Sequence, residues 1–225
     1  MATPSLRYFL YRKSRAGQVP REVLGEEFGG TVTCDFPGRC SPSPCARARA
    51  GYGGYNKLGV LQRCWAHLLQ DAKELAELNA DRPEVVAWEQ SLKALYQEAK
   101  AFSHPNPRAR RRERRRFERL AGELARPFAD DASAPQRTLS QRLLKHRHEL
   151  FVFVSNPEVP PTNNLAERSL RPAVIARKIS GGTRSAKGSD TKMGLMSLFG
   201  TWAAQGKPLL ASCQQLLFSS AIRAP

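Results

Sequence analysis

The sequence predicts an α/β protein in which helices make up the larger share. Short β-branched and aromatic runs stand near the N-terminus, at residues 6–13 and 31–34, whereas apolar residues recur at helical spacing from residue 65 onward. With 225 residues, 41% of them hydrophobic, the chain can form one or two domains with a buried core. No apolar run suits a membrane helix and the N-terminus lacks a signal-peptide layout, so we expect a cytoplasmic protein.

The predicted strands lie in the first third of the chain. Residues 6–13 run into Lys-Ser-Arg-Ala-Gly, which indicates a strand followed by a turn. Residues 31–34 alternate in the manner of a second strand, with Asp35 at its C-terminal end, and residues 60–64 are compatible with a short third strand. Residues 37–50 have no apolar periodicity and predict an irregular insertion, which a frameshifted patch would explain.

Helices are predicted for most of the remaining chain. An apolar stripe begins at Trp65, and Asn106-Pro107 supplies an N-cap and a first-turn proline for a helix whose residues 108–119 include eight arginines. Leucines at helical spacing mark another helix over 139–150. Two closing helices are expected, one capped near Ser189 or Asp190 and one starting at Pro208.

The charge balance makes nucleic acid the leading partner class. The chain has 36 Lys and Arg against 20 Asp and Glu, a net charge of +16, and such a surplus favours contacts with phosphates. Arginines one helical turn apart repel one another without a counter-anion, so we expect this helix to bind the DNA backbone rather than to form a passive solvated face. The candidate DNA contacts on it are Arg108, Arg110, Arg111, Arg112, Arg114, Arg115 and Arg116.

The five cysteines do not form the framework of a secreted protein. Their number is odd and their spacing is irregular, which favours reduced cysteines with structural roles. A zinc site assembled from Cys40, Cys45, Cys64 and His67 is the less favoured alternative, because the first pair is too widely spaced for a usual zinc knuckle.

Glu167 is the leading candidate for metal-dependent chemistry. Asn164 and Glu167 have the spacing of a helix capping box, so a structural role is the competing interpretation. A carboxylate among side chains suited to phosphate is also what a metal-assisted phosphodiester enzyme requires. The basic residues around it, which we also expect to contact DNA, are Arg168, Arg171, Arg177, Lys178, Arg184 and Lys187.

Three motifs carry a resemblance to a known family. Thr162-Asn-Asn-Leu-Ala-Glu-Arg-Ser-Leu-Arg-Pro172, followed by Arg177-Lys178 and Ser180-Gly-Gly-Thr, resembles the C-terminal catalytic motif of the insertion-sequence-66 family of transposases. Cys64-Trp-Ala-His67 and Gly51-Tyr-Gly-Gly-Tyr-Asn56 resemble the middle block of that family. The likeness covers most of residues 6–217.

The resemblance implies a fold and a reaction. The fold is a partial RNase H-like core at 1–64, a large all-helical insertion at 65–155 and C-terminal helices at 156–225. Glu167 is then the glutamate of an Asp-Asp-Glu triad and Asp35 its second aspartate, and together they hold Mg²⁺ or Mn²⁺ for cleavage and strand transfer. Transposon ends and target DNA are the implied partners, a homo-oligomer is possible, and the location is the bacterial nucleoid. Cys64 and His67 are expected to pack and form hydrogen bonds beside the core rather than to ligate the metal.

Three departures from the family pattern indicate a truncated copy with little or no autonomous activity. Residues 1–34 contain no aspartate that could serve as the first triad acid. Ala50, rather than aspartate, precedes Gly51-Tyr52, so either Asp35 or the Ala50 position corresponds to the second acid. The missing upstream strands are also expected to leave a gap between the strands that remain.

Two alternatives to an active transposase remain. The first is a non-enzymatic DNA-binding remnant, which is expected to bind duplex DNA in a salt-dependent way without cleaving it. The second is a basic RNA-binding protein that stacks bases on Phe36, Tyr52 and Tyr55.

Overall fold

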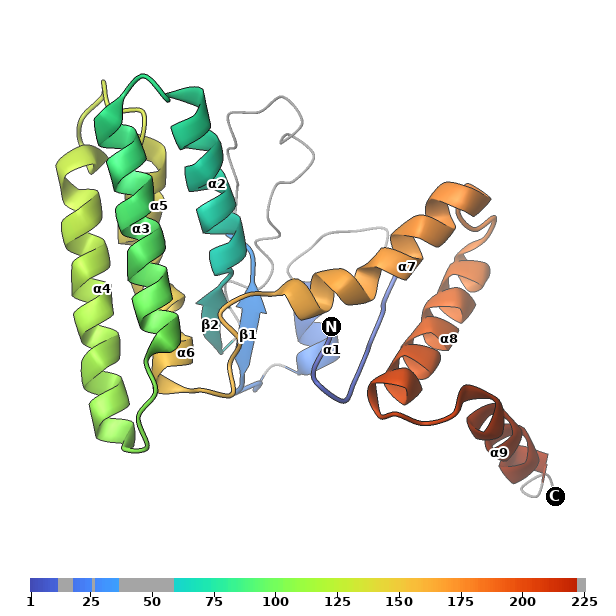
Figure 1. The fold of residues 1–225 in the computed structure, drawn as a ribbon. Coiled ribbons are helices and arrows are strands. Elements are labelled where there is room, and N and C mark those ends of the chain that lie inside the picture. The colour runs from blue at the N-terminus through green and yellow to red at the C-terminus, as the bar shows by residue number, and fades with distance from the viewer. Residues whose placement is uncertain (12–17, 26, 37–58, 222–225) are drawn as a thin grey trace. The chain divides into compact units, whose positions relative to one another are not determined.

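The computed structural model describes residues 1–11, 18–25, 27–36 and 59–221, and most of them are helical (Figure 1). They form two compact units, of which one spans residues 15–163 and the other joins residues 1–14 to residues 164–225. The sheet within the described residues is a parallel pair of strands. This architecture agrees with the predicted α/β class and its large helical share.

The two strands pair directly. Strand β1 (Thr31–Cys34) lies parallel to β2 (Val60–Arg63), with Thr31 opposite Val60 and Cys34 opposite Arg63. The pair begins at a close backbone approach, where a Cβ atom on Gly59 would lie 2.5 Å from the carbonyl oxygen of Gly30. This pairing joins residues 31–34 to residues 60–63, so it does not test the gap expected between the segments 6–13 and 31–34.

The N-terminal segment is not the predicted strand. Residues 6–11, the described part of the expected strand 6–13, belong to the second unit and pack on helix α8 (Ala186–Ala204). The Arg7 N–H donates to Thr201 Oγ1 at 3.0 Å, and the Phe9 N–H donates to Ser197 Oγ at 2.8 Å. Hydroxyl groups of a helix thus replace the neighbouring strand that the aromatic pattern predicted.

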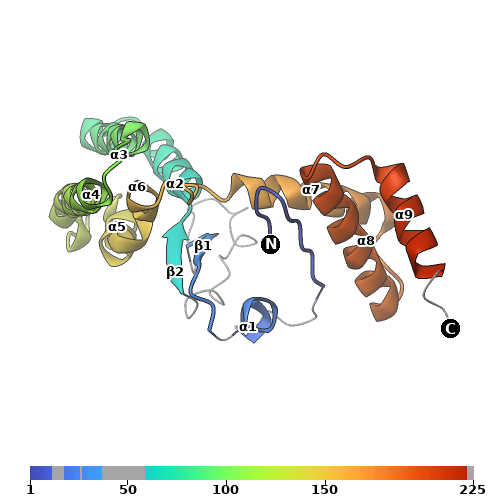
Figure 2. The same ribbon diagram turned by 90° about the horizontal axis from the view of Figure 1, so that it is seen from below.

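Helices dominate the unit that spans residues 15–163. Figure 2 shows α2 to α6 grouped together, with the strand pair at one side of the group. The helices α2 and α4 confirm the predicted starts at Trp65 and Pro107, and α5 confirms the expected helix over 139–150. The bounds are α1 (Gln18–Leu24), α2 (Trp65–Leu78), α3 (Pro83–Ala101), α4 (Pro107–Ala129), α5 (Arg137–Leu150) and α6 (Val152–Ser155).

Aromatic side chains from several of these helices meet in the core of this unit. The rings of Trp65 and Phe151 are 5.2 Å apart in an edge-to-face arrangement, and the rings of Phe117 and Phe151 stack at 5.8 Å. Trp65 also donates its indole N–H to the carbonyl oxygen of Leu150 at 2.6 Å. The start of α2 and the end of α5 are therefore locked together just below the C-terminal end of β2.

The second unit contains the remaining helices. They are α7 (Asn164–Ser180), α8 and α9 (Leu209–Ala221). Ser185 caps α8 by accepting a hydrogen bond from the Gly188 N–H at 3.0 Å, so this helix starts before the expected cap at Ser189 or Asp190. Among the described residues, none of the helices combines the length and the apolar character needed to span a bilayer.

Candidate functional site

Asp35 lies directly after β1, at the edge of the sheet where both parallel strands end. Cys34 is opposite Arg63, so the next residues along the two strands are Asp35 and Cys64. The Cys64 N–H donates to the Cys34 carbonyl at 2.9 Å, which fixes the start of α2 against the end of β1. The parallel register thus brings together two motifs that lie 29 residues apart in sequence.

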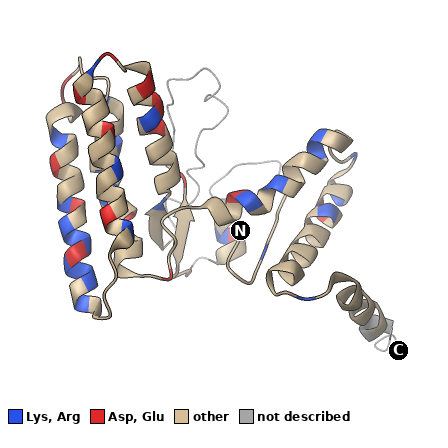
Figure 3. Ribbon diagram, in the orientation of Figure 1, with Lys and Arg blue, Asp and Glu red and all other residues tan. Residues whose placement is uncertain are grey.

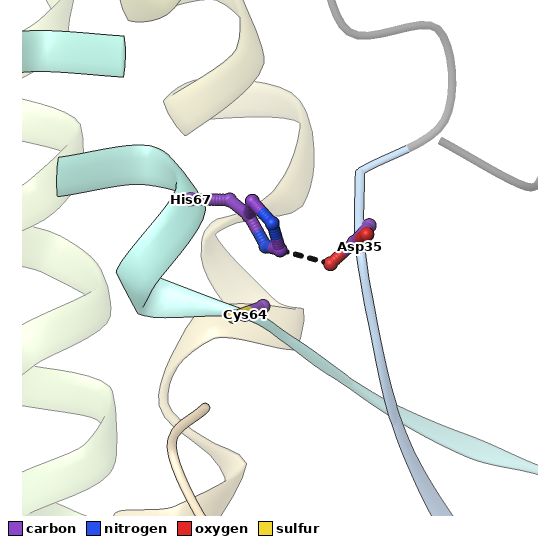
Figure 4. A group of neighbouring side chains, drawn as sticks. All are labelled: Asp35, Cys64 and His67. Carbon is purple, nitrogen blue, oxygen red and sulfur yellow. Dashed lines mark ion pairs between the residues drawn. The ribbon is translucent and has the colours of Figure 1, made fainter. Parts of the chain in front are cut away.

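Asp35, Cys64 and His67 form a compact cluster at this edge (Figure 4). Their nitrogen, oxygen and sulfur ligand atoms all lie within 4.8 Å of one another. His67 Nδ1 is 2.7 Å from Asp35 Oδ1, and Cys64 is fully buried beneath them. His67 stands in the first turn of α2, so its position relative to Cys64 is set by the helix itself.

Asn163, which is distant from Asp35 and Cys64 in the sequence, also contacts this cluster. Its Nδ2 donates to Asp35 Oδ1 at 2.8 Å, and its backbone N–H donates to Cys64 Sγ at 3.4 Å. The same segment is anchored by the Trp65 N–H, which donates to the Pro161 carbonyl at 3.0 Å. Sequence reasoning quoted Asn163 within the Asn-Asn-Leu-Ala-Glu motif but gave it no role, because only the fold shows what it touches.

The electrostatics of the cluster favour an ion pair. Burial by itself lowers the pKa of His67, but the interactions with Asp35 and Cys64 outweigh burial and raise the pKa to about 10. His67 is therefore protonated at neutral pH and pairs with the carboxylate of Asp35. The contact with Asp35 agrees with the hydrogen-bonding role expected for His67 from the sequence.

A buried arginine supports the cluster from below. Arg63 is 1% exposed and donates from its guanidinium to the Asp35 backbone carbonyl at 2.7 Å and to Cys34 Sγ at 3.3 Å. Its Nε also donates to Glu149. Desolvation raises the pKa of the Cys34 thiol to about 11, so Cys34 stays a neutral thiol that accepts this hydrogen bond. Cys34 and Cys64 are both free thiols.

The donor set around Asp35 does not fit Mg²⁺. Magnesium binds oxygen ligands in octahedral geometry and retains several waters. Here Asp35 Oδ1 already receives His67 and Asn163, and the remaining neighbours offer sulfur and nitrogen. Among the residues that the structure describes, this group is the one where three or more metal-ligating side chains of His, Cys, Asp or Glu converge.

Glu167 stands in the first turn of α7 and is exposed. It belongs to the unit formed by residues 1–14 and 164–225, whereas Asp35 belongs to the unit formed by residues 15–163. Helix α7 begins at Asn164, three residues before Glu167. The pairing of Asp35 with Glu167 therefore stays a prediction from the family motif.

The arginines of α4 divide into two groups. Arg110 donates to the carbonyls of His104 and Pro105, Arg114 to Glu118 and the His148 carbonyl, and Arg116 to Glu98 and Glu113. These three side chains are half-buried and bind within the unit. The exposed arginines share one side of the helix, which we call the arginine face: Arg108, Arg111, Arg112, Arg115 and Arg119.

The arginine face is solvent-accessible along several turns of α4. Basic residues recur down this helix in Figure 3, and an open hollow of about 590 Å³ lies along them. An acidic neighbour of this face, Glu123, lies 3.6 Å from Arg119. The lining of the hollow is Arg108, Arg111, Arg112, Glu113, Arg115, Arg116 and Arg119.

The other residues predicted to contact nucleic acid or metal differ in their exposure to solvent. In the second unit the basic side chains expected to contact DNA are all exposed: Arg168, Arg171, Arg177, Lys178, Arg184 and Lys187. Phe36 is fully buried against His146 and Arg142, so it is not a platform for stacking bases. Cys40, Cys45, Ala50, Tyr52 and Tyr55, and with them the insertion 37–50, lie outside the described residues.

Comparisons with known proteins extend these observations. The family model described as "Transposase IS66 family" matches residues 1–191. A protein of Sinorhizobium fredii (strain NBRC 101917 / NGR234), named "Uncharacterized protein y4jO", is 43% identical over 61 residues. That match covers 26% of this chain and 19% of the relative, so the chain spans about a fifth of the curated protein it resembles. No solved structure matches the chain.

Proposed function

The chain belongs to the IS66 family of transposases, and we propose that it binds duplex DNA through the arginine face while carrying only part of the family's cleavage site. The observation that carries the proposal is the division of the α4 arginines. Three of them bind within the protein, whereas Arg108, Arg111, Arg112, Arg115 and Arg119 stand exposed.

The spacing of the arginine face suits a phosphate backbone. From Arg108 to Arg119 the helix rises about 16 Å, and positions three and four residues apart lie on one side. Guanidinium groups bind phosphates through paired hydrogen bonds, and the buried side of α4 keeps this helix rigid through Phe117 and Ala121. Contacts of this kind supply affinity without reading base sequence. The exposed basic residues of α7 and α8 are proposed to add to the same electrostatic attraction.

Salt dependence tests this proposal directly. Each lost phosphate contact reduces the slope of log K against log salt by about 1, so replacing Arg111, Arg112 and Arg115 by Gln is expected to reduce it by about 3. Binding of a random-sequence duplex would be measured by fluorescence anisotropy across a salt series. The purified protein and the variant would be compared at equal protein concentration.

A matched control separates local contact from total charge. Lys73, Lys93 and Lys100 are exposed on α2 and α3, and their replacement by Gln removes the same charge from the same unit. We expect this control to keep the slope of the unmodified protein. Equal losses in the two triple variants would show that DNA is attracted by net charge alone, and the arginine face would not be its binding site. Tighter binding of structured RNA than of duplex DNA would favour the RNA-binding alternative.

The catalytic part of the proposal is a site with two of the family's three acids. Asp35 and Glu167 are the proposed acids of a proposed partial RNase H-like core, and the family resemblance supports this assignment. Asn163 supports it as well, because this residue contacts Asp35 and precedes Glu167 by four positions. Because residues 1–34 contain no aspartate and the donor set around Asp35 does not fit Mg²⁺, we expect no strand cleavage by these 225 residues on their own.

A nicking assay tests the catalytic part. Supercoiled plasmid would be incubated with the purified chain and Mg²⁺ or Mn²⁺, with Glu167→Gln as the matched variant. The expected result is the same low background for both proteins. Metal-dependent nicking by the unmodified chain that Glu167→Gln abolishes would contradict the proposed incomplete site and leave the DNA-binding proposal untouched.

A further inference from the structure

We infer that Asp35, Cys64, His67 and Asn163 form a binding site for a transition-metal ion of the Zn²⁺ type. The donor set is what distinguishes this site from the magnesium site of the family resemblance. A thiolate, an imidazole nitrogen and a carboxylate oxygen suit Zn²⁺, whereas Mg²⁺ takes oxygen ligands. The inference is independent of the proposed DNA binding, because it involves no residue of the arginine face.

The distances within the cluster are close to those of a metal site. Tetrahedral zinc, with bonds of about 2.0–2.3 Å, places its ligand atoms roughly 3.3–3.8 Å apart. The ligand atoms of Asp35, Cys64 and His67 already lie within 4.8 Å of one another. Asp35 and His67 are half-buried, 30% and 18% exposed, and we expect small rotations of these side chains to adjust the spacing around an ion.

Asn163 supplies an independent indication of a ligand. Its Nδ2 end already contacts Asp35, while its Oδ1 atom is buried and accepts no hydrogen bond from the described residues. A buried acceptor without a partner is unfavourable, and a cation relieves that penalty. We therefore take this amide oxygen as the fourth ligand of the proposed ion.

The surroundings of the cluster hold the ligands in place. Cys64 is fully buried and fixed by two backbone interactions, its own N–H with Cys34 and the Asn163 N–H at its sulfur. Asp35 is oriented through Arg63, which binds its backbone carbonyl. Binding replaces the thiol proton of Cys64 and the ring proton that His67 shares with Asp35, and both protons pass to solvent.

Such an ion would connect three segments that are distant in sequence. Asp35 follows β1, Cys64 and His67 open α2, and Asn163 precedes α7. Because the ligand set is complete only in the folded chain, metal binding is expected to raise the melting temperature.

Cobalt provides the test, because tetrahedral Co²⁺ bound to a thiolate has d–d bands and a charge-transfer band that octahedral aqueous Co²⁺ lacks. The full purified chain, stripped with chelator and kept reduced, would be titrated with Co²⁺ in a large excess of Mg²⁺. We expect one equivalent of Co²⁺ to produce the spectrum of tetrahedral, thiolate-bound Co²⁺. Zn²⁺ added afterwards should displace the bound Co²⁺ and abolish this spectrum. An octahedral spectrum, or loss of the signal in Mg²⁺, would overturn the inference.

Variants identify the ligands. Cys64→Ser is expected to remove the charge-transfer band, and Asp35→Asn and His67→Gln are expected to weaken binding at least about tenfold, the lower end of losses seen even for outer contacts of metal sites. Cys213→Ser and the double variant Cys40→Ser/Cys45→Ser should keep the spectrum. Loss of the spectrum in the double variant would overturn the site in favour of one built on Cys40 and Cys45. Circular dichroism of the metal-free variants checks that each of them is folded. If Cys64→Ser does not fold, the metal affinity of Asp35→Asn, the least disruptive change, decides whether the cluster is the binding site.

Discussion

At the scale of single residues, the edge of the sheet depends on a charge network that the sequence does not reveal. Arg63 is buried at the end of β2 and binds Glu149, which also contacts His146 at 3.0 Å. Burial opposes ionisation of Glu149, but the hydrogen bonds from His146 and Arg63 outweigh it and lower its pKa. A buried guanidinium is stable only with such a partner, so Glu149 helps to hold Arg63 against the backbone of Asp35.

Ionisation of the Glu149 carboxylate makes the free energy of unfolding depend on pH, and this free energy falls as the solution becomes acidic. A carboxyl whose pKa is lower in the folded state stabilises the fold above its unfolded pKa, near 4.5, and this contribution disappears as the pH falls through the folded value. We therefore expect Glu149→Gln to lower the free energy of unfolding by about 1–2 kcal/mol at neutral pH. The difference from the unmodified protein should shrink progressively below about pH 4.5.

Urea denaturation at a series of pH values measures this difference. Glu158→Gln is the matched control, because Glu158 is an exposed glutamate of the same unit. A stability difference for Glu149→Gln that stays constant from neutral to acidic pH would contradict the assigned role of the carboxylate.

At the scale of secondary-structure elements, α4 carries both the arginine face and a well-defined start. Asn106 accepts a hydrogen bond from the Arg108 N–H at 2.8 Å, and Pro107 follows as the first helical residue. Loss of a side-chain N-cap costs about 1 kcal/mol, which corresponds to a melting-temperature decrease of roughly 2–4 °C in a chain of this size. We expect this decrease for Asn106→Ala by scanning calorimetry and little change for Asn106→Ser. Equal melting temperatures for Asn106→Ala and the unmodified protein would show that the cap is not needed.

The elements also show how far sequence reasoning reaches. The helices that start at Trp65 and Pro107 were predictable because the apolar stripe of the first and the N-cap and proline of the second are local signals. The segment 6–11 was not predictable, because its backbone donors are satisfied by hydroxyl groups almost 200 residues away in the sequence. Which arginines of α4 remain exposed also depends on partners from other helices, such as Glu98 and His148.

In the candidate site, too, local features were predictable from the sequence and contacts between distant segments were not. Asp35 was placed correctly at the end of its strand, and His67 at the start of the helix that follows β2. Cys64 was expected to end the strand over 60–64, and it directly follows β2 as the residue before α2. Their convergence with Asn163 was not visible, because the contact between Asn163 and Asp35 joins positions 128 residues apart. Parallel strand register, which a single sequence does not encode locally, brings these residues to one edge.

At the scale of the whole molecule, the hydrophobic core is distributed unequally between the two units. Among the described residues, the main core cluster consists entirely of side chains between Phe36 and Val159. The other unit buries far less, since α7 contains no buried residue and Ile179 and Leu210 are 82% and 74% exposed. Because burial of apolar area is the dominant stabilising contribution, stability should reside in residues 15–163.

This inequality predicts the behaviour of the separated units. A fragment of residues 15–163 keeps the whole core cluster, both strands and the arginine face. We expect it to unfold cooperatively, with a melting temperature within a few degrees of that of the full chain, and to retain most of the salt slope for duplex DNA. A fragment of residues 164–225, which lacks the 1–14 segment of its unit, should show partial helicity without a cooperative transition, because its helices have too little core to fold alone. Circular dichroism melts of both fragments measure this, and a cooperative transition in the second fragment alone would reverse the assignment of the stable unit.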